Sequence, residues 1–151
     1  MNAISKRFDG LALVRILVGL VFLYSGWEKV ATPVEQFIAV IHQYRLFPAE
    51  WESVLAQVVS WSEFVFGSFL LLGFMIRVSA SVIAVLLVSF MALLSRSSWL
   101  GLPIAECGCF GSLLSLTPFQ AILLDSFLFL MTVTVLISQP RAASLDGWLH
   151  R

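Results

Sequence analysis

Four long apolar windows constrain the fold of this chain more than any other feature. They run at about 11–30, 55–75, 78–95 and 119–138. A helix needs about 20 mostly apolar residues to cross the hydrocarbon core of a membrane, and the windows are of about that length. None of them shows the period-two alternation of a transmembrane β-strand. The sequence therefore predicts an all-α integral membrane protein, with four transmembrane helices in a single domain over residues 1–151.

The composition supports a membrane protein and excludes several other classes. Hydrophobic residues make up 60% of the chain and charged residues 12%, whereas an average soluble domain is about 25% charged. So few polar groups cannot cover the surface of a soluble domain, and so many apolar residues exclude a disordered chain. Nine Lys and Arg are balanced by nine Asp and Glu, so the basic excess of a nucleic-acid-binding protein is absent. The expected partner of most of the surface is the lipid bilayer.

The basic residues are unequally divided between the two ends of the predicted bundle. Short loops on the cytoplasmic side of a membrane carry an excess of Lys and Arg. The end with both termini has Lys6, Arg7, Arg15, Arg77, Arg141 and Arg151, and the other end has Lys29, Arg45 and Arg96. Arg15 is included because a long basic side chain one turn inside a membrane can extend to the surface. Both termini are therefore predicted to be cytoplasmic, and the segment 96–118 external.

The connection between the first two windows is long enough to contain a helix of its own. Apolar residues recur there at helical spacing within 34–44, at Phe37, Ile41 and Tyr44. Pro33 suits the start of a helix and Pro48 its end. The pattern predicts a short external helix that lies along the membrane interface.

Both cysteines of the chain lie one residue apart in the segment 96–118. Disulfides persist on the outer side of a membrane, and a bond between Cys107 and Cys109 closes a very small ring. Gly108 between them tolerates the unusual backbone angles of such a ring. A strained, exposed disulfide suits exchange, and closing so short a loop adds little stability. The pattern predicts a redox-active pair at Cys107 and Cys109.

Two other interpretations of this pair stay open. The two thiols can be loop residues without a role. They can also bind a soft metal ion, but a zinc site needs four ligands. The two histidines, His42 and His150, are far from the cysteines in the sequence or on the opposite predicted face. A resident metal is therefore not expected.

Three ionisable residues are predicted at or inside the outer half of the membrane. Glu63 and Asp125 lie within the second and fourth windows, and Lys29 ends the first. Charged side chains in a membrane normally face the bundle interior and pair with one another, so Lys29 is expected to pair with Glu63 or Asp125. Such a pair can simply lock the bundle. Alternatively, the surplus carboxylate can accept protons that thiol oxidation releases, as part of a proton relay beneath the cysteines.

Lys29 shares one face of its helix with residues that favour close packing. Gly26, Phe22 and Gly19 precede it at steps of three or four residues. Small residues on one stripe let two membrane helices approach closely. Lys29 is therefore predicted to face the interior of the bundle.

Several short motifs resemble those of a known group of membrane proteins. The chain contains Arg15-x3-Gly19, Phe22, Ser25-Gly26-x2-Lys29, Tyr44-x-Leu46-x-Pro48, Glu63-x3-Gly67 and Leu71-Leu72-Gly73. These motifs resemble DoxX-like membrane proteins. The unit Cys107-Gly-Cys-Phe-Gly111, with Asp125 in the helix that follows, resembles the methylamine-utilisation branch of MauE-like proteins. The resemblance covers about residues 15–125.

The resemblance implies a four-helix protein of the bacterial inner membrane with a periplasmic cysteine segment. In the MauE-like branch, the implied role is maturation of a disulfide-rich periplasmic enzyme subunit beside a thioredoxin-like partner. Other DoxX-like proteins are linked to quinone or thiol oxidation, so a quinone is the candidate cofactor. One cysteine pair on one side of a membrane cannot carry electrons across it alone. The protein therefore needs a quinone, another subunit or the export of a small thiol.

These observations lead to a working hypothesis of a membrane thiol–disulfide oxidoreductase. Cys107 and Cys109 exchange with a periplasmic thioredoxin-like or cysteine-containing partner, and Lys29, Glu63 and Asp125 support them as a charge and proton relay. Two alternatives are a non-catalytic membrane subunit for maturation or assembly, and a transporter of a small solute or thiol.

Overall fold

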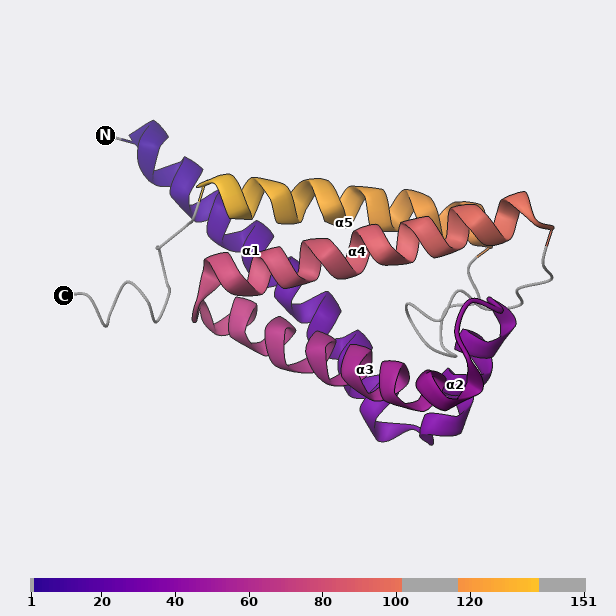
Figure 1. The fold of residues 1–151 in the computed structure, drawn as a ribbon. Helices are drawn as coiled ribbons and strands as arrows, with labels where there is room; N and C mark the ends of the chain where they lie inside the picture. Colours follow the sequence, from indigo (N-terminus) through magenta and orange to yellow (C-terminus); the bar gives the residue numbers. More distant parts are fainter. Residues whose placement is uncertain (1, 102–116, 139–151) are drawn as a thin grey trace.

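The computed structural model describes residues 2–101 and 117–138, with side chains from Gly10 onward except that of Pro118. These residues form five helices (Figure 1): α1 (Asn2–Ala31), α2 (Val34–Gln43), α3 (Ala49–Leu72), α4 (Ile76–Trp99) and α5 (Pro118–Ser138). The four long helices form a bundle in which α4 and α5 run alongside each other. The short α2 lies at the end of the bundle where α1 ends and α3 begins.

Four of the helices are long and apolar enough to cross a membrane. The segments are Gly10–Ala31, Ala49–Leu72, Ile76–Trp99 and Phe119–Ser138. Each one contains most of one predicted window, so the prediction of an all-α membrane protein with four transmembrane helices is confirmed. The chain therefore contacts a lipid bilayer along these helices.

The ends of α3 differ from the predicted window at 55–75. The helix begins at Ala49, because a helix can extend through polar residues before its apolar part starts. It ends at Leu72, because Gly73 takes a left-handed conformation with φ 70° that closes the helix. Met75 also has a positive φ of 46° at the start of α4, so the turn between α3 and α4 is tight.

The other helices also extend past the predicted windows. α1 reaches back to Asn2, and α4 continues to Trp99. The first four residues of the predicted connection 96–118 are therefore helical, because a helix can continue through polar residues such as Arg96 beyond its apolar window.

The short helix predicted at 34–44 is present as α2, with Tyr44 as its C-cap and without a buried residue. Two polar contacts fasten this part of the chain to the bundle. His42 Nδ1 lies 3.0 Å from Glu52 Oε1 on α3, and Arg96 Nη1 on α4 donates to the Tyr44 carbonyl oxygen at 3.3 Å. The position of α2 along a membrane interface stays a prediction.

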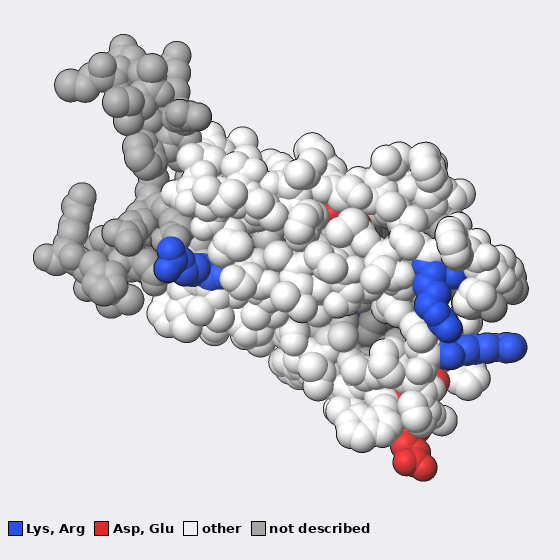
Figure 2. All heavy atoms as spheres, turned by 45° about the horizontal axis from the view of Figure 1, so that its top comes forward, with Lys and Arg blue, Asp and Glu red and all other residues white. Residues whose placement is uncertain are grey.

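A narrow stripe of buried residues on each long helix faces the interior of the bundle. On α5 the stripe alternates steps of four and three residues: Ala121, Asp125, Leu128, Thr132 and Val135. Large apolar side chains such as Leu123, Phe127 and Leu130 are exposed on the same helix, as suits a surface in lipid. The large groups of charged side chains in Figure 2 lie toward the ends of the molecule, with a broad uncharged band between them.

Arg15 departs from its predicted position. The expectation that its side chain extends to the membrane surface is wrong, because the residue is only 1% exposed. Arg15 lies on the inward stripe of α1, three residues after the buried Ala12 and seven before the buried Phe22. The rotation of α1 that packs this stripe against its neighbours therefore places the guanidinium inside the protein.

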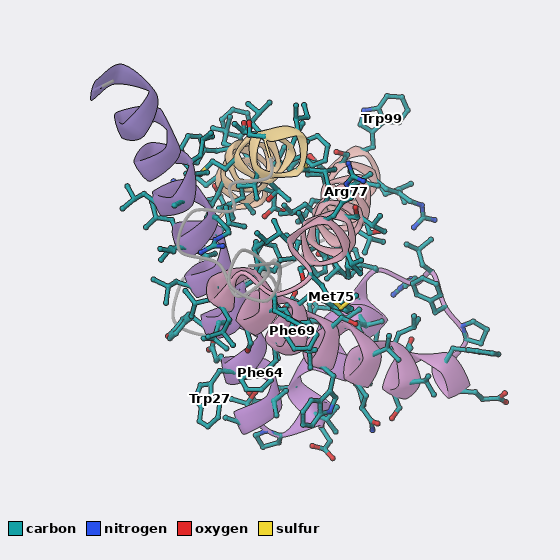
Figure 3. The ribbon with its side chains drawn as sticks, turned by 90° about the vertical axis from the view of Figure 1, so that its left-hand side faces the viewer. Trp27, Phe64, Phe69, Met75, Arg77 and Trp99 are labelled. Atoms are coloured by element: carbon teal, nitrogen blue, oxygen red, sulfur yellow. The ribbon has the colours of Figure 1, made fainter. Side chains whose placement is uncertain are left out.

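Glycines set the separation of α1 and α3. A Cβ on Gly19 would lie 2.7 Å from the Leu71 nitrogen, and a Cβ on Gly26 would lie 2.6 Å from the Phe64 Cα. Side chains do not fit at these distances, so the two backbones are close only because both residues are glycine. Beside this contact, the Trp27 ring lies 6.1 Å from that of Phe64, centroid to centroid (Figure 3). The close packing predicted for the glycine stripe is confirmed.

Candidate functional site

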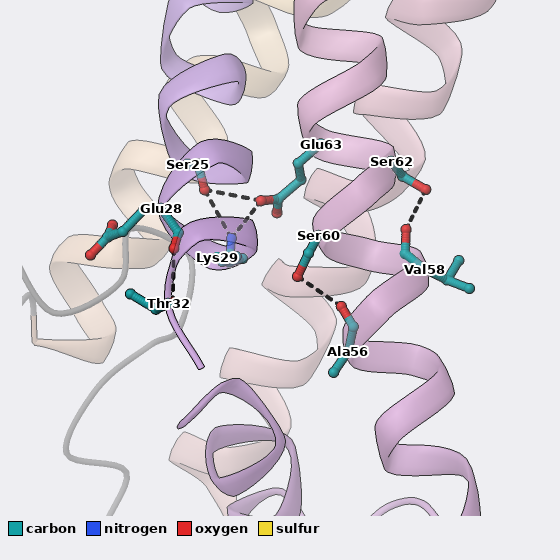
Figure 4. A network of polar contacts seen from close by, with 9 residues as sticks. All are labelled: Ser25, Glu28, Lys29, Thr32, Ala56, Val58, Ser60, Ser62 and Glu63. Atoms are coloured by element: carbon teal, nitrogen blue, oxygen red, sulfur yellow. Dashed lines mark hydrogen bonds and ion pairs between the residues drawn. The ribbon is translucent and has the colours of Figure 1, made fainter. Parts of the chain in front are cut away.

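A buried ion pair joins α1 to α3. Lys29 Nζ donates to Glu63 Oε2 at 2.5 Å, and both side chains are almost fully buried. Ser25 Oγ donates to the same carboxylate oxygen at 3.0 Å, while Lys29 Nζ donates to Ser25 Oγ at 2.8 Å. The three side chains thus form a closed triangle of contacts (Figure 4). The predicted pairing of Lys29 with a carboxylate inside the bundle is confirmed, with Glu63 as a partner.

The local sequence explains how this triangle forms. Ser25 lies one helical turn before Lys29, so both side chains project from the same face of α1. Gly26 lies between them and packs on the backbone of Glu63 and Phe64. Because this glycine has no side chain, α3 comes close enough for the Glu63 carboxylate to reach both partners.

Two aromatic rings cover the Lys29 ammonium. Lys29 Nζ lies 5.3 Å from the centroid of the Phe37 ring on α2 and 5.7 Å from that of Phe90 on α4. The negative face of an aromatic ring attracts a cation at such distances. The charge of Lys29 is therefore held by a carboxylate from α3 and by rings from two further helices.

Asp125 belongs to the same region. It is 2% exposed, and it lines a small cavity together with Ser25 and Glu63. The cavity is about 10 Å³, which is about the room that one water molecule needs. The structure thus gathers the three ionisable residues that the sequence singles out, Lys29, Glu63 and Asp125, within one part of the bundle.

Cys107 and Cys109 lie outside the described residues. The segment that contains them connects Trp99 at the end of α4 to Pro118 at the start of α5. Both of these helix ends lie at the end of the bundle where α1 also terminates (Figure 1). The connectivity therefore attaches the cysteine segment at the end of the bundle near which Lys29 is buried.

Sequence reasoning missed two buried polar residues: Ser25, which belongs to this site, and Glu52, which contacts His42 of α2. Ser25 is 4% exposed and Glu52 is 4% exposed. The signal for Ser25 is its place four residues before Lys29. The signal for Glu52 is its spacing from the buried Ala56 and Ser60, but the prediction placed Glu52 in an external connection instead of a helix.

The chain matches the model of a known protein family. The family described as methylamine utilisation protein MauE matches residues 9–138. No curated protein and no solved structure matched the chain. The resemblance to MauE-like proteins is therefore confirmed, and the wider DoxX-like assignment stays a prediction.

Proposed function

Because the chain belongs to the MauE family of methylamine utilisation proteins, we propose that it is a membrane thiol–disulfide redox protein that serves this pathway. Cys107 and Cys109 cycle between a dithiol and a disulfide. Their partner is a periplasmic thioredoxin-like protein or a substrate protein with cysteines. The observation that carries the proposal is that the only two cysteines of the chain stand one residue apart in the connection between α4 and α5.

The exchange step moves two electrons and two protons. A thiolate of one protein attacks a sulfur of the disulfide in the other, and a mixed disulfide forms as the first bond breaks. The second thiol of the attacking pair then breaks the mixed disulfide. One protein ends as the disulfide and the other as the dithiol, so no further oxidant enters this step.

The buried charges are proposed to support this exchange. Lys29, Glu63 and Asp125 are ionisable groups inside a membrane protein, where charges are costly and are retained mainly for function. Lys29 lies two residues before the end of α1 and pairs there with Glu63 of α3, and Asp125 lines a small cavity together with Glu63. In this role they take up and release protons as the thiols ionise, and Ser25 extends the network through its hydroxyl.

A quinone head group does not fit the apolar cavity between α2, α3 and α4. That cavity, of about 220 Å³, is lined by the described residues Tyr44 and Ser89 and otherwise by apolar side chains. The Ser89 hydroxyl already donates to the Val85 carbonyl oxygen. The described lining therefore offers few polar side chains to the two carbonyl oxygens of a quinone. We therefore derive no step through a quinone.

The two alternative functions, a small-solute transporter and a non-catalytic maturation subunit, require different features of the structure. A transporter of a small solute needs a polar cavity large enough for its cargo, and the cavity beside Glu63 and Asp125 has room for about one water. A non-catalytic maturation subunit needs neither cysteine.

Replacement of the cysteines tests the proposal. Cys107→Ser and Cys109→Ser are each expected to abolish methylamine-dependent growth in cells that lack the native gene. One of the two variants is expected to accumulate a mixed disulfide with the partner, because its remaining thiol cannot resolve the bond. Alkylation mass shift and non-reducing electrophoresis measure both states.

Ser112→Ala, in the same connection, is the matched control and is expected to grow normally. Full growth of both cysteine variants contradicts the redox function and favours the maturation subunit. Loss of growth without any mixed disulfide or redox change also counts against exchange.

A further inference from the structure

An apolar cavity lies between α2, α3 and α4. Its volume is about 220 Å³, and its wall includes Phe37 and Ile41 from α2, Leu55 and Val59 from α3, and Phe90 and Leu93 from α4. An apolar cavity of about 150 Å³ in another protein stays dry and binds benzene. The cavity here is larger and is lined by apolar side chains apart from Tyr44 and Ser89, so a hydrocarbon chain suits it better than water does.

The cavity wall continues into the surface that faces the bilayer. Ser89 lines the cavity and is exposed on α4, and its neighbour Val88 is 48% exposed. On α3, Val58 is 57% exposed next to the lining residue Val59. Because α3 and α4 are membrane-spanning segments, the medium at this edge of the cavity is lipid hydrocarbon.

α2 is held over the cavity by polar contacts outside it. The contact of His42 with Glu52 fixes α2 to α3. The hydrogen bond from Arg96 to the Tyr44 carbonyl fixes the end of α2 to α4. The cavity therefore has a covering wall, rather than an open apolar face.

The inner wall of the cavity shields the buried ion pair. Phe37 and Phe90 line the cavity, and the ammonium of Lys29 lies over both rings. A chain in the cavity packs against the same two rings. A hydrocarbon chain in the cavity would therefore add to the apolar cover of Lys29. Without it, the rings of Phe37 and Phe90 lack dispersion contacts on the side that faces the cavity.

We propose that the cavity between α2, α3 and α4 binds an acyl chain of a membrane phospholipid, which enters from the bilayer beside Ser89 and packs against Phe37 and Phe90. The lining offers no charged side chain for a head group among the described residues, so the head group stays outside. The assignment is independent of the redox function.

Photo-crosslinking of the full chain in lipid nanodiscs tests this assignment. The probe is a phosphatidylethanolamine that carries a diazirine on its acyl chain, and mass spectrometry locates the labelled residues. Label is expected on residues of the cavity wall. Val59→Phe and Ser89→Phe each fill the cavity with a ring, so they are expected to reduce this label several-fold.

Val58→Phe and Val88→Phe are the matched controls. They add the same ring one residue away on the lipid-facing surface, and the label in the cavity is expected to be unchanged. Ser89→Phe changes an exposed position, which keeps the test valid if Val59→Phe does not fold.

Two results overturn the assignment. Equal label in the cavity variants and the controls means that the acyl chain lies only on the outer surface. Displacement of the cavity label by an equal concentration of an isoprenoid quinone means that the occupant is a quinone and not a phospholipid chain.

Discussion

At the scale of single residues, Lys29 is the centre of a network of buried contacts. Its ammonium contacts the Glu63 carboxylate and the Ser25 hydroxyl, and the rings of Phe37 and Phe90 cover it. Removing one member of a buried pair leaves the other charge without compensation. Replacing both members with apolar residues removes the cost of burying either charge.

Lys29→Met or Glu63→Leu alone is therefore expected to lower the free energy of unfolding by about 3–5 kcal/mol. The double variant is expected to regain most of this loss. Denaturation in mixed micelles measures the stability, and Val30→Met, at the neighbouring lipid-facing position, is the control. If the double variant is stable but does not support growth on methylamine, the pair has a role beyond packing. If it is stable and grows normally, the proposed proton relay through Lys29 and Glu63 is wrong.

At the scale of elements, the crossing of α1 and α3 positions the ion pair. The close approach uses glycines on both helices, since a Cβ on Gly67 of α3 would lie 2.6 Å from the Leu23 nitrogen of α1. In a membrane, helices associate through such close van der Waals packing, because lipid provides no hydrophobic driving force between them. The glycines therefore contribute both to stability and to the distance between Lys29 and Glu63.

Gly26→Ala is expected to destabilise the bundle by about 1–3 kcal/mol, because the added methyl group meets the α3 backbone. It is also expected to weaken the Lys29–Glu63 contact, since the two helices must separate. Gly10→Ala is the matched control, because a Cβ there meets nothing within 4 Å. The control is expected to be neutral or slightly stabilising, as alanine favours a helix. Equal stability of the two variants contradicts this account of the α1–α3 crossing.

At the scale of the whole molecule, the number of spans sets the relation between the two ends of the chain segment that crosses the membrane. Because the four described spans are an even number, the start of the first and the end of the last lie on the same side of the membrane. The tight turn between α3 and α4 lies at the end of the bundle where α1 begins, whereas α4 ends and α5 begins at the other end (Figure 1). We propose that the termini are cytoplasmic and that the cysteine connection is periplasmic in a bacterial inner membrane. The proposal rests on the distribution of basic residues.

A membrane-impermeant maleimide tests this orientation, because Cys107 and Cys109 are the only thiols. After reduction, the reagent is expected to label them in cells whose outer membrane alone is permeable. The double serine variant gives the background. Label that requires disruption of the inner membrane contradicts a periplasmic location.

The four spans and the inward face of α1 follow from the order of the residues alone. Apolar character over about 20 residues is a local property, so it indicates a membrane helix without knowledge of its neighbours. The glycine stripe before Lys29 is equally local. The polar first turns of α3 lack this signal, which is why the predicted window at 55–75 begins six residues after Ala49.

The pairing of polar groups depends on how the helices pack in three dimensions. Arg15 lies on the same stripe of α1 as Gly19 and Phe22, but its burial required that neighbouring helices cover the stripe as far as this residue. The Ser25 hydroxyl donates to the Glu63 carboxylate because α3 comes close to α1 at Gly26. Glu52 is buried opposite His42 because α2 folds back on α3. Each of these contacts joins residues from separate helices or depends on how helices pack. Spacing along one helix fixes the face on which a residue lies, but it does not fix the element that the face meets.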